Sequence, residues 1–292
     1  EFHDSACRLA GRLESFGLGR GDRVLALLPN CGEYAMLYFA ALYLGVVVVP
    51  VNPALHPRDR SFVLKNAGAK LLVYRGEAPA EGPALRWELP PWPWKDPPRR
   101  PSGGLTADDL LTIVFTSGTT AFPKAVAHHA GSLIGNALAF NEAMGLAPEL
   151  RFLHLFPMAY SGGFFNLLIS PFLAGASVVM TPGFGPRTAL DFWRVPRRCA
   201  VNALWLNPAI AAALVRVDRD EEGREWCRNN IRRCFIGTAP LHLQLRRDFE
   251  SRYGVRLYES YGLSETLLAT AQGPKTGSWE DSVGLPLPGV RL

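Results

Sequence analysis

The chain has 292 residues, 48% of them hydrophobic and 20% charged, which is the composition of a globular protein and excludes a low-complexity or fibrous one. The net charge of +5 comes from scattered arginines rather than from a basic block, which argues against nucleic acid as a partner. Five cysteines without a C-x-x-C pair predict neither a disulfide framework nor a zinc site. They favour a reducing, cytoplasmic location.

Residues 1–75 alternate helix and strand patterns, which is the rhythm of a doubly wound α/β fold. We expect helices near 3–16, 34–44 and 57–67, and strands at 24–28, 46–50 and 70–74. The stretch 34–51 has no charged residue, but Gly45 divides it into a helical half and a valine-rich strand. We therefore predict no transmembrane segment there, although peripheral contact with a membrane stays open.

Residues 76–104 are dense in proline and show neither a helical nor a strand period. They include the run Pro90-Pro91-Trp92-Pro93-Trp94. Such a composition favours extended backbone, so we expect a connector between a first α/β portion, 1–75, and a second, 105–292.

The alternation of strand and helix resumes after the connector. We expect strands at 111–115, 152–156, 177–180, 203–206, 233–236 and 256–259, and helices at 130–144, 164–173, 186–194, 208–216 and 241–253. This pattern predicts mainly parallel sheets with flanking helices. Open sheets of this kind bind ligands outside the carboxyl ends of their strands.

A loop suited to phosphate follows the apolar strand at 111–115. It reads Thr116-Ser117-Gly118-Thr119-Thr120-Ala121-Phe122-Pro123-Lys124. Glycine lets the backbone approach a ligand, successive N–H groups can cradle an anion, and lysine adds a mobile positive charge. The Walker pattern is absent, because alanine rather than serine or threonine follows Lys124. From composition alone, a Ser/Thr-rich surface turn remains the alternative.

Three further segments follow predicted strands. They are Pro-Met-Ala-Tyr-Ser-Gly-Gly at 157–163, Gly-Thr-Ala-Pro-Leu at 237–241 and Tyr-Glu-Ser-Tyr-Gly-Leu-Ser-Glu-Thr at 258–266. In this order and spacing, and together with the phosphate loop, they resemble the motifs of the adenylate-forming superfamily. That superfamily contains acyl-CoA synthetases, luciferases and the adenylation domains of peptide synthetases. The segments 21–53 and 283–289 are also similar to its patterns, so the resemblance runs along essentially the whole chain.

The resemblance implies the large N-terminal domain of the adenylate-forming fold, truncated before the family's C-terminal domain. It implies an acid–thiol ligase that uses ATP and Mg²⁺ to convert a carboxylic acid to acyl-AMP and then transfers the acyl group to coenzyme A. The family's hinge, its ribose-binding aspartate and its C-terminal lysine have no counterpart in these residues. We therefore expect this fragment alone to be incomplete for full turnover.

The resemblance also implies roles for individual residues. The β- and γ-phosphates of ATP are expected at Thr116, Ser117, Gly118, Thr119, Thr120 and Lys124. The rest of the nucleotide is expected at Gly237, Thr238, Ala239, Pro240, Glu259, Ser260, Tyr261, Gly262, Leu263 and Ser264, with Tyr261 stacked on adenine and Ser264 at the α-phosphate. Glu265 is expected to hold magnesium. Lys124, Thr119 and Glu265 are the expected catalytic residues.

The acid substrate is expected at Tyr160, Ser161, Gly162 and Trp205. Apolar neighbours such as Phe164 favour a fatty or aromatic acid, although ordinary core packing explains the same residues. One alternative is a domain that adenylates an amino acid or aryl acid and loads a carrier protein; residues 156–170 lack the acidic residue that amino-acid-activating domains usually have. The other is a non-catalytic nucleotide-binding relative, suggested by Ala121 where the family usually has glycine.

Overall fold

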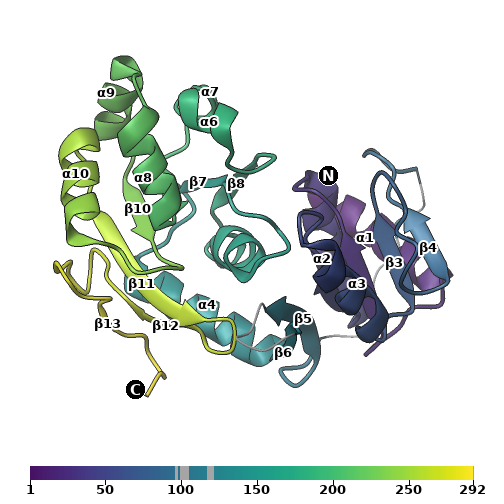
Figure 1. Ribbon diagram of the computed structural model, residues 1–292. Coiled ribbons are helices and arrows are strands. Elements are labelled where there is room, and N and C mark those ends of the chain that lie inside the picture. Colours follow the sequence, from purple (N-terminus) through teal and green to yellow (C-terminus); the bar gives the residue numbers. More distant parts are fainter. Residues whose placement is uncertain (96–97, 99–104, 117–121, 292) are drawn as a thin grey trace. The chain divides into compact units, whose positions relative to one another are not determined.

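A computed structural model describes residues 1–95, 98, 105–116 and 122–291, and the chain divides into two compact units. The first unit comprises residues 1–133 and 157–161, and the second comprises residues 134–156 and 162–292. Each unit contains one sheet with helices beside it (Figure 1).

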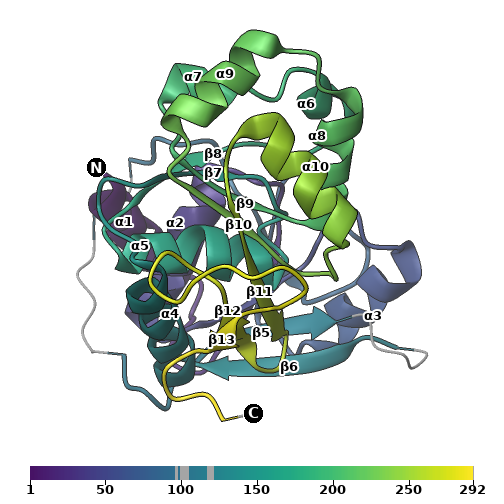
Figure 2. The same ribbon diagram turned by 90° about the vertical axis from the view of Figure 1, so that its left-hand side faces the viewer.

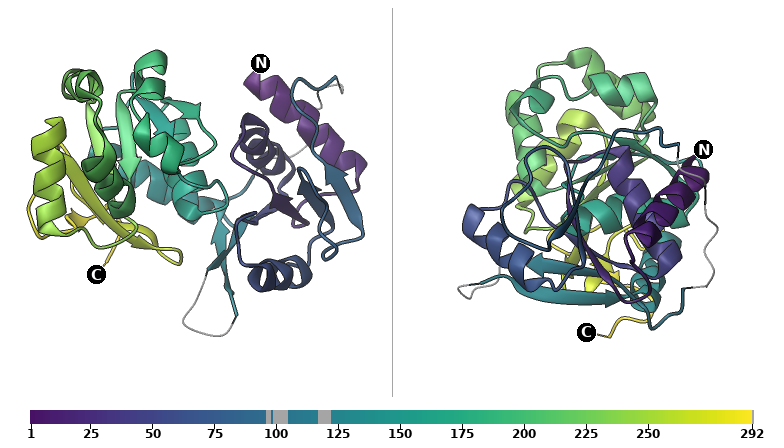
Figure 3. Two further views of the ribbon diagram at one scale, coloured as in Figure 1. Left: turned by 45° about the horizontal axis from the view of Figure 1, so that its top comes forward. Right: turned by 90° about the vertical axis from the view of Figure 1, so that its right-hand side faces the viewer.

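The sheet of the first unit orders its described strands as β4-β3-β1-β2-β5-β6. The elements of this unit are α1 (Phe2–Ser15), β1 (Arg23–Leu27), α2 (Gly32–Leu44), β2 (Val47–Pro50), α3 (Pro57–Asn66), β3 (Leu71–Tyr74), β4 (Leu85–Glu88), β5 (Leu110–Thr116) and β6 (Lys124–His129). Its strand pairs are parallel apart from β5 and β6, which form an antiparallel hairpin. The helices α1, α2 and α3 flank the sheet (Figure 3).

The core of the first unit explains its continuous apolar strands. Leu25 of β1, Val49 of β2 and Leu72 of β3 are fully buried and belong to one cluster with Val63 and Leu64 of α3. Strands of a parallel sheet are covered on both faces, so they need apolar residues at successive positions rather than at alternate ones.

The uncharged stretch 34–51 divides at Gly45, as the sequence predicts. α2 ends at Leu44, Gly45 has a φ of 66°, and β2 begins at Val47. Glycine is favoured at this helix end because an L side chain is strained at a positive φ. Among the described helices, none combines the length and the apolar character that a membrane crossing requires.

The sheet of the second unit orders its described strands as β13-β12-β11-β10-β9-β7-β8. Its elements are β7 (Arg151–His154), the π-helix η1 (Gly162–Ile169), α5 (Ser170–Leu173), β8 (Ser177–Met180), α6 (Pro186–Leu190), α7 (Arg194–Cys199), β9 (Ala203–Leu206), α8 (Pro208–Val217), α9 (Glu221–Asn230), β10 (Arg233–Ile236), α10 (Leu243–Tyr253), β11 (Leu257–Leu263), β12 (Leu267–Ala271) and β13 (Leu285–Pro286). Helix α4 (Ala130–Met144) begins in the first unit and ends in the second. Helix α8 lies beside α10 (Figure 2).

Parallel pairing from β8 to β11 is followed by antiparallel pairing from β11 to β13. The register pairs Ile236, the last residue of β10, with Glu259 of β11. The segment that follows β10 therefore leaves the sheet beside β11, which continues to Leu263. The predicted class, mainly parallel sheets with flanking helices, is confirmed.

Several element predictions were wrong in detail. Strand β4 lies inside the segment predicted to be an extended connector, where no strand was expected, and helix α9 was not predicted because its sequence is mostly polar. The helix expected at 186–194 is two short helices, since the backbone departs from helical geometry at Asp191.

The strand predictions were also wrong at β6 and β11. Strand β6, which follows the phosphate loop, was missed because most of its side chains are exposed and it lacks an apolar pattern. Strand β11 continues past the predicted end at Glu259 to Leu263, where it pairs with the unpredicted strand β12.

Two glycines, Gly284 and Gly289, differ in how closely other residues approach them. Gly284 and Gly289 have similar φ values of 88° and 83°. A Cβ on Gly284 would lie 2.1 Å from the carbonyl carbon of Ala271 in β12, whereas one on Gly289 would meet nothing within 4 Å. We expect Gly284→Ala to lower the free energy of unfolding by about 3 kcal/mol and Gly289→Ala by about 1 kcal/mol, because only the first adds a clash to the backbone strain. Urea denaturation measures both, and equal losses would contradict the close approach of Gly284 to β12.

Candidate functional site

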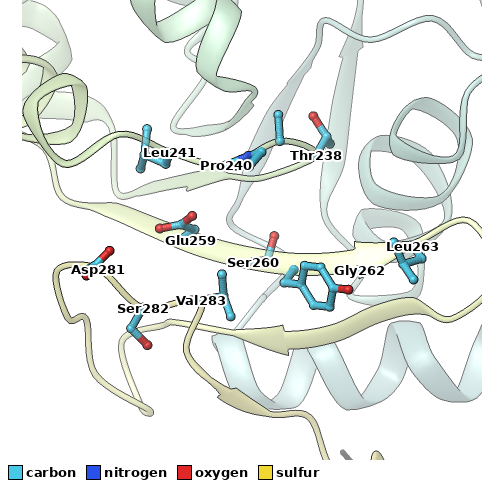
Figure 4. A pocket seen from close by; sticks show the side chains of 12 residues that line it. Thr238, Pro240, Leu241, Glu259, Ser260, Gly262, Leu263, Asp281, Ser282 and Val283 are labelled. Carbon is cyan, nitrogen blue, oxygen red and sulfur yellow. The ribbon is translucent and has the colours of Figure 1, made fainter.

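A pocket of about 590 Å³ lies at the carboxyl ends of β10 and β11. Its walls come from 238–241 after β10, from 259–263 in β11 and from 281–283 before β13. In Figure 4, β11 runs between the other two segments, with Pro240 on one side and Ser282 on the other. Its volume is that of a site for a small organic ligand.

The backbone around this pocket is unusually constrained. A Cβ on Gly237 would lie 2.8 Å from the carbonyl oxygen of Ser260, so only glycine allows β10 to continue this close to β11. Thr238 has a φ of 74°, a strained value for a β-branched residue. The pairing of β11 with β12 shifts register between Tyr261 and Gly262. Such strain and bulges concentrate where a fold re-aims side chains toward a ligand.

Glu259 places a nearly buried carboxylate in the pocket. Its side chain is 10% exposed, and its Oε2 lies 3.9 Å from Nη1 of Arg246 on α10. Burial raises the pKa of the Glu259 carboxyl above its ordinary value, while the Arg246 guanidinium and the backbone N–H of Leu241 oppose that shift. Asp281, across the pocket, raises the same pKa by like-charge repulsion.

Two apolar side chains are exposed along the pocket edge of β11. Tyr261 is 45% exposed and Leu263 is 51% exposed. Both line the pocket. An exposed aromatic ring beside a pocket offers a flat surface on which a planar ligand can stack.

Ser264 and Glu265 lie in the turn that joins β11 to β12. The backbone N–H of Leu263 donates to Oγ1 of Thr266 at 3.1 Å, which closes this turn. Glu265 is exposed. The part of the chain that the structure describes contains no group of three or more His, Cys, Asp or Glu residues placed to hold a metal.

The described ends of the predicted phosphate loop belong to the first unit. Thr116 ends β5 and pairs with Lys124, the exposed first residue of β6. Beside Lys124 in the sequence, Phe122 stacks on Phe62 with ring centroids 4.9 Å apart. Ser117, Gly118, Thr119, Thr120 and Ala121 lie outside the described residues, so their roles stay predictions.

The predicted substrate residues fall in both units. In the first, the N–H of Met158 donates to Oδ1 of Asn30 at 2.7 Å, and Tyr160 is 40% exposed, with Ser161 next to it. In the second, Gly162 begins η1. Trp205 is fully buried on β9.

The ring of Trp205 stacks on Phe140 with centroids 4.9 Å apart and contacts Phe235 at 5.2 Å. Trp205 therefore packs in the aromatic core of the second unit, and it does not line the pocket at β10 and β11. A role for it toward the acid substrate stays a prediction.

The structure brings together most of the predicted nucleotide residues of the second unit. Those that line the pocket are Thr238, Ala239, Pro240, Glu259, Ser260, Tyr261, Gly262 and Leu263. Sequence reasoning missed Leu241, Asp281, Ser282 and Val283 as pocket residues. Leu241 could have been found from its place at the end of the Gly-Thr-Ala-Pro-Leu motif. Val283 could have been found from its place at the start of the closing Val-Gly-Leu-Pro pattern.

Comparison with known sequences points to one family. The sequence profile described as "AMP-binding enzyme" matches residues 1–292. The long-chain-fatty-acid–CoA ligase FadD13 of Mycobacterium tuberculosis is 28% identical over 94% of this chain and 57% of that protein. The sulfoacetate–CoA ligase of Cupriavidus necator is 29% identical over 88% of this chain and 52% of that protein. The 2-succinylbenzoate–CoA ligase of Bacillus licheniformis is 29% identical over 91% of this chain and 54% of that protein. The chain therefore spans a little more than half the length of these three relatives.

A solved structure shows the same fold. ATP-bound MatB from Rhodopseudomonas palustris superposes with a TM-score of 0.86 and 26% sequence identity. The superposition covers 99% of this chain and 59% of MatB.

Replacing the buried carboxylate tests its environment. Because the pKa of Glu259 is raised on folding, the folded protein binds more protons than the unfolded chain once the pH exceeds the ordinary value of 4.5. The wild type should therefore lose stability relative to Glu259→Gln as the pH rises from about 4.5 through the raised pKa. Urea denaturation of both proteins across this range measures the difference. A difference that grows in favour of the wild type with rising pH would show that the carboxylate is not destabilised by burial.

Proposed function

Because the chain belongs to the AMP-binding enzyme family, we propose that it is the nucleotide-binding part of an enzyme that activates a carboxylic acid with ATP and then joins it to the thiol of coenzyme A. One observation carries this proposal. The segments that the sequence motifs assign to the nucleotide, 238–240 and 259–263, line one pocket at the carboxyl ends of adjacent strands. The named relatives are all CoA ligases, although their acids differ in chemistry.

The pocket offers what adenine requires. Ala239 and Pro240 supply an apolar wall on one side, and the exposed ring of Tyr261 supplies a stacking surface. The carboxylate of Glu259 would accept a hydrogen bond from the exocyclic amine of adenine. Guanine carries a carbonyl oxygen at that position, which the carboxylate would repel. The site should therefore prefer ATP to GTP.

Charge stabilisation on the phosphates would come from residues of the loop and of the β11–β12 turn. Lys124 is exposed and carries a mobile positive charge, and Thr116 offers a hydroxyl. Magnesium usually keeps several waters and takes one or two protein carboxylates together with substrate phosphates, a donor set to which the exposed Glu265 can contribute. Bound magnesium would neutralise charge that develops on the phosphates.

The proposed reaction has two steps. The substrate carboxylate attacks the α-phosphorus of ATP, the bond from that phosphorus to the bridging oxygen breaks, and pyrophosphate leaves. The thiolate of coenzyme A then attacks the acyl carbon, and AMP leaves. Lys124 would hold the pyrophosphate as its charge develops, and Ser264 would donate to the α-phosphate oxygens.

We propose an apolar acid as the substrate. Every residue of η1 is buried, including Phe164 and Phe165, and this helix directly follows the substrate motif that contains Tyr160 and Ser161. An acid site beside this helix would be apolar and would favour an aliphatic or aromatic body over a polar one. None of the five cysteines, all of which the structure describes, forms a disulfide, which supports the cytoplasmic location proposed from the sequence.

An acid panel tests the activity. The full-length protein should release pyrophosphate from ATP in the presence of aliphatic or aromatic acids, and release should require the acid. Lys124→Met should lower this rate about a hundredfold, because it removes the positive charge that would stabilise the negative charge developing on the phosphates. Lys70→Met serves as the control, because it removes the same charge from an exposed ion pair with Asp22, outside the loop, and should leave the rate nearly unchanged. No acid-dependent release across the panel would exclude the proposed reaction.

Variants of Tyr261 test the adenine site separately. Tyr261→Ala should weaken ATP binding about tenfold, because the stacking surface is lost. Tyr261→Phe keeps the ring and should bind nearly as well as the wild type. Titration calorimetry measures both affinities. Equal affinities of the two variants would place adenine away from Tyr261.

A further inference from the structure

Arg246, on α10, is a charged side chain with almost no access to solvent. It is 2% exposed, and no role is assigned to it by the sequence motifs. Its Nη1 donates to the carbonyl oxygen of Trp279 at 2.6 Å. Its Nη2 donates to the carbonyl oxygen of Leu257 at 2.5 Å and to Oε1 of Gln272 at 2.7 Å. The guanidinium thus joins α10, β11 and the segment that leads to β13.

Two acidic side chains complete the surroundings of Arg246. Its Nε donates to Oε1 of Glu250 at 3.4 Å, one helical turn later. Its Nη1 lies 3.9 Å from Oε2 of Glu259, the carboxylate in the pocket. The planar fork of an arginine carries five N–H donors, and this site presents an acceptor in each direction.

Gln272, just after β12, extends this cluster to the pocket wall. It is fully buried, and its Nε2 donates to the carbonyl oxygens of Trp279 at 2.7 Å and Ser282 at 2.5 Å. Its backbone N–H donates to the carbonyl oxygen of Glu259 at 2.7 Å. Arg246 and Gln272 therefore share Trp279 as an acceptor and together hold the segment 279–283.

We propose that Arg246 is a positioning residue of the nucleotide pocket: it fixes the wall formed by 281–283 and orients the Glu259 carboxylate toward the base. This inference rests on the proposed function. Arg246 contacts neither the base nor the reacting atoms, so it acts through Glu259, Gln272 and Trp279.

The charged groups that face Glu259 explain why its carboxylate needs a positively charged partner. Arg246 faces it from α10, and Asp281 faces it from the opposite wall of the pocket. Without Arg246, Glu259 would keep its burial and its like-charge neighbour but lose its counter-charge. Removing one partner of a buried pair leaves the other uncompensated, so Glu259 would bind a proton at a higher pH than in the wild type.

The neighbouring Arg247 provides a matched control. It follows Arg246 on the same helix, and its Nε and Nη2 donate to the two carboxylate oxygens of Glu280 at 2.9 and 2.6 Å. Its side chain is 55% exposed, however, and its partner Glu280 does not line the pocket. Arg246→Met and Arg247→Met remove the same charge from adjacent positions.

Titration calorimetry with ATP at several pH values tests the inference. Arg246→Met should bind ATP about tenfold more weakly than the wild type at neutral pH, because the pocket wall and Glu259 lose their buried partner. Its affinity should fall further as the pH is lowered, and this fall should begin at a higher pH than in the wild type. The reason is that Glu259 becomes protonated and loses the negative charge that strengthens its hydrogen bond with the amine. Arg247→Met should match the wild type in both respects. Adding Glu259→Gln to Arg246→Met should abolish this pH dependence.

Contrary results are distinguishable. If the wild type does not bind ATP, the proposed function is wrong. If the wild type binds and Arg246→Met behaves as Arg247→Met does, Arg246 is not a positioning residue. Should Arg246→Met fail to fold, Arg246→Lys replaces it as the test, because lysine keeps the positive charge but lacks the planar fork of donors. This variant should bind ATP more weakly than the wild type, with little change in the pH dependence. Unchanged affinity would overturn the inference.

Discussion

Parallel pairing of β10 with β11 is the constraint on which the pocket depends. The register of Ile236 with Glu259 places the segment that follows β10 beside the last residues of β11, although the two are separated in sequence by the whole of α10. Strand β11 then continues and pairs with β12 in the antiparallel sense. This change of direction turns the open end of a parallel sheet into a pocket with a third wall at 281–283. Ligand binding at the carboxyl ends of strands follows from the topology rather than from any single side chain.

Several strained and buried groups of the second unit lie at this pocket. Gly237 and Gly262 sit where any Cβ would collide with neighbouring backbone, and Thr238 holds a strained φ. Glu259 and Arg246 add a buried ion pair. Burying charges and straining backbone both lower stability, so a fold that accepts them at one place gains something other than stability there. Recognition of a polar, planar ligand is the gain that fits these groups.

The sequence predicted the pocket segments well because each one follows a strand and contains residues with a physical reason to lie there. Segments 238–240 and 259–263 were both predicted, and they line one pocket. The wall at 281–283 was missed, because it is brought in by hydrogen bonds of Arg246 and Gln272 that leave no periodic signal in the chain. Strand β6 was missed because antiparallel pairing with β5, rather than burial, makes it a strand. A role of Trp205 toward the acid stays a prediction, since the structure shows only that its ring packs on Phe140 in the aromatic core.

Photolabelling with 8-azido-ATP tests most directly whether adenine occupies this pocket. The reactive group sits on the base, so labelled peptides should contain residues of 237–241 or 259–263, and unmodified ATP should compete for labelling. The second unit offers another pocket of about 500 Å³, lined by β7, β8, α6 and α7, with Arg187 and Arg198 among its residues. Competed labelling confined to that pocket, with none at 237–241 or 259–263, would contradict the assignment of the nucleotide site.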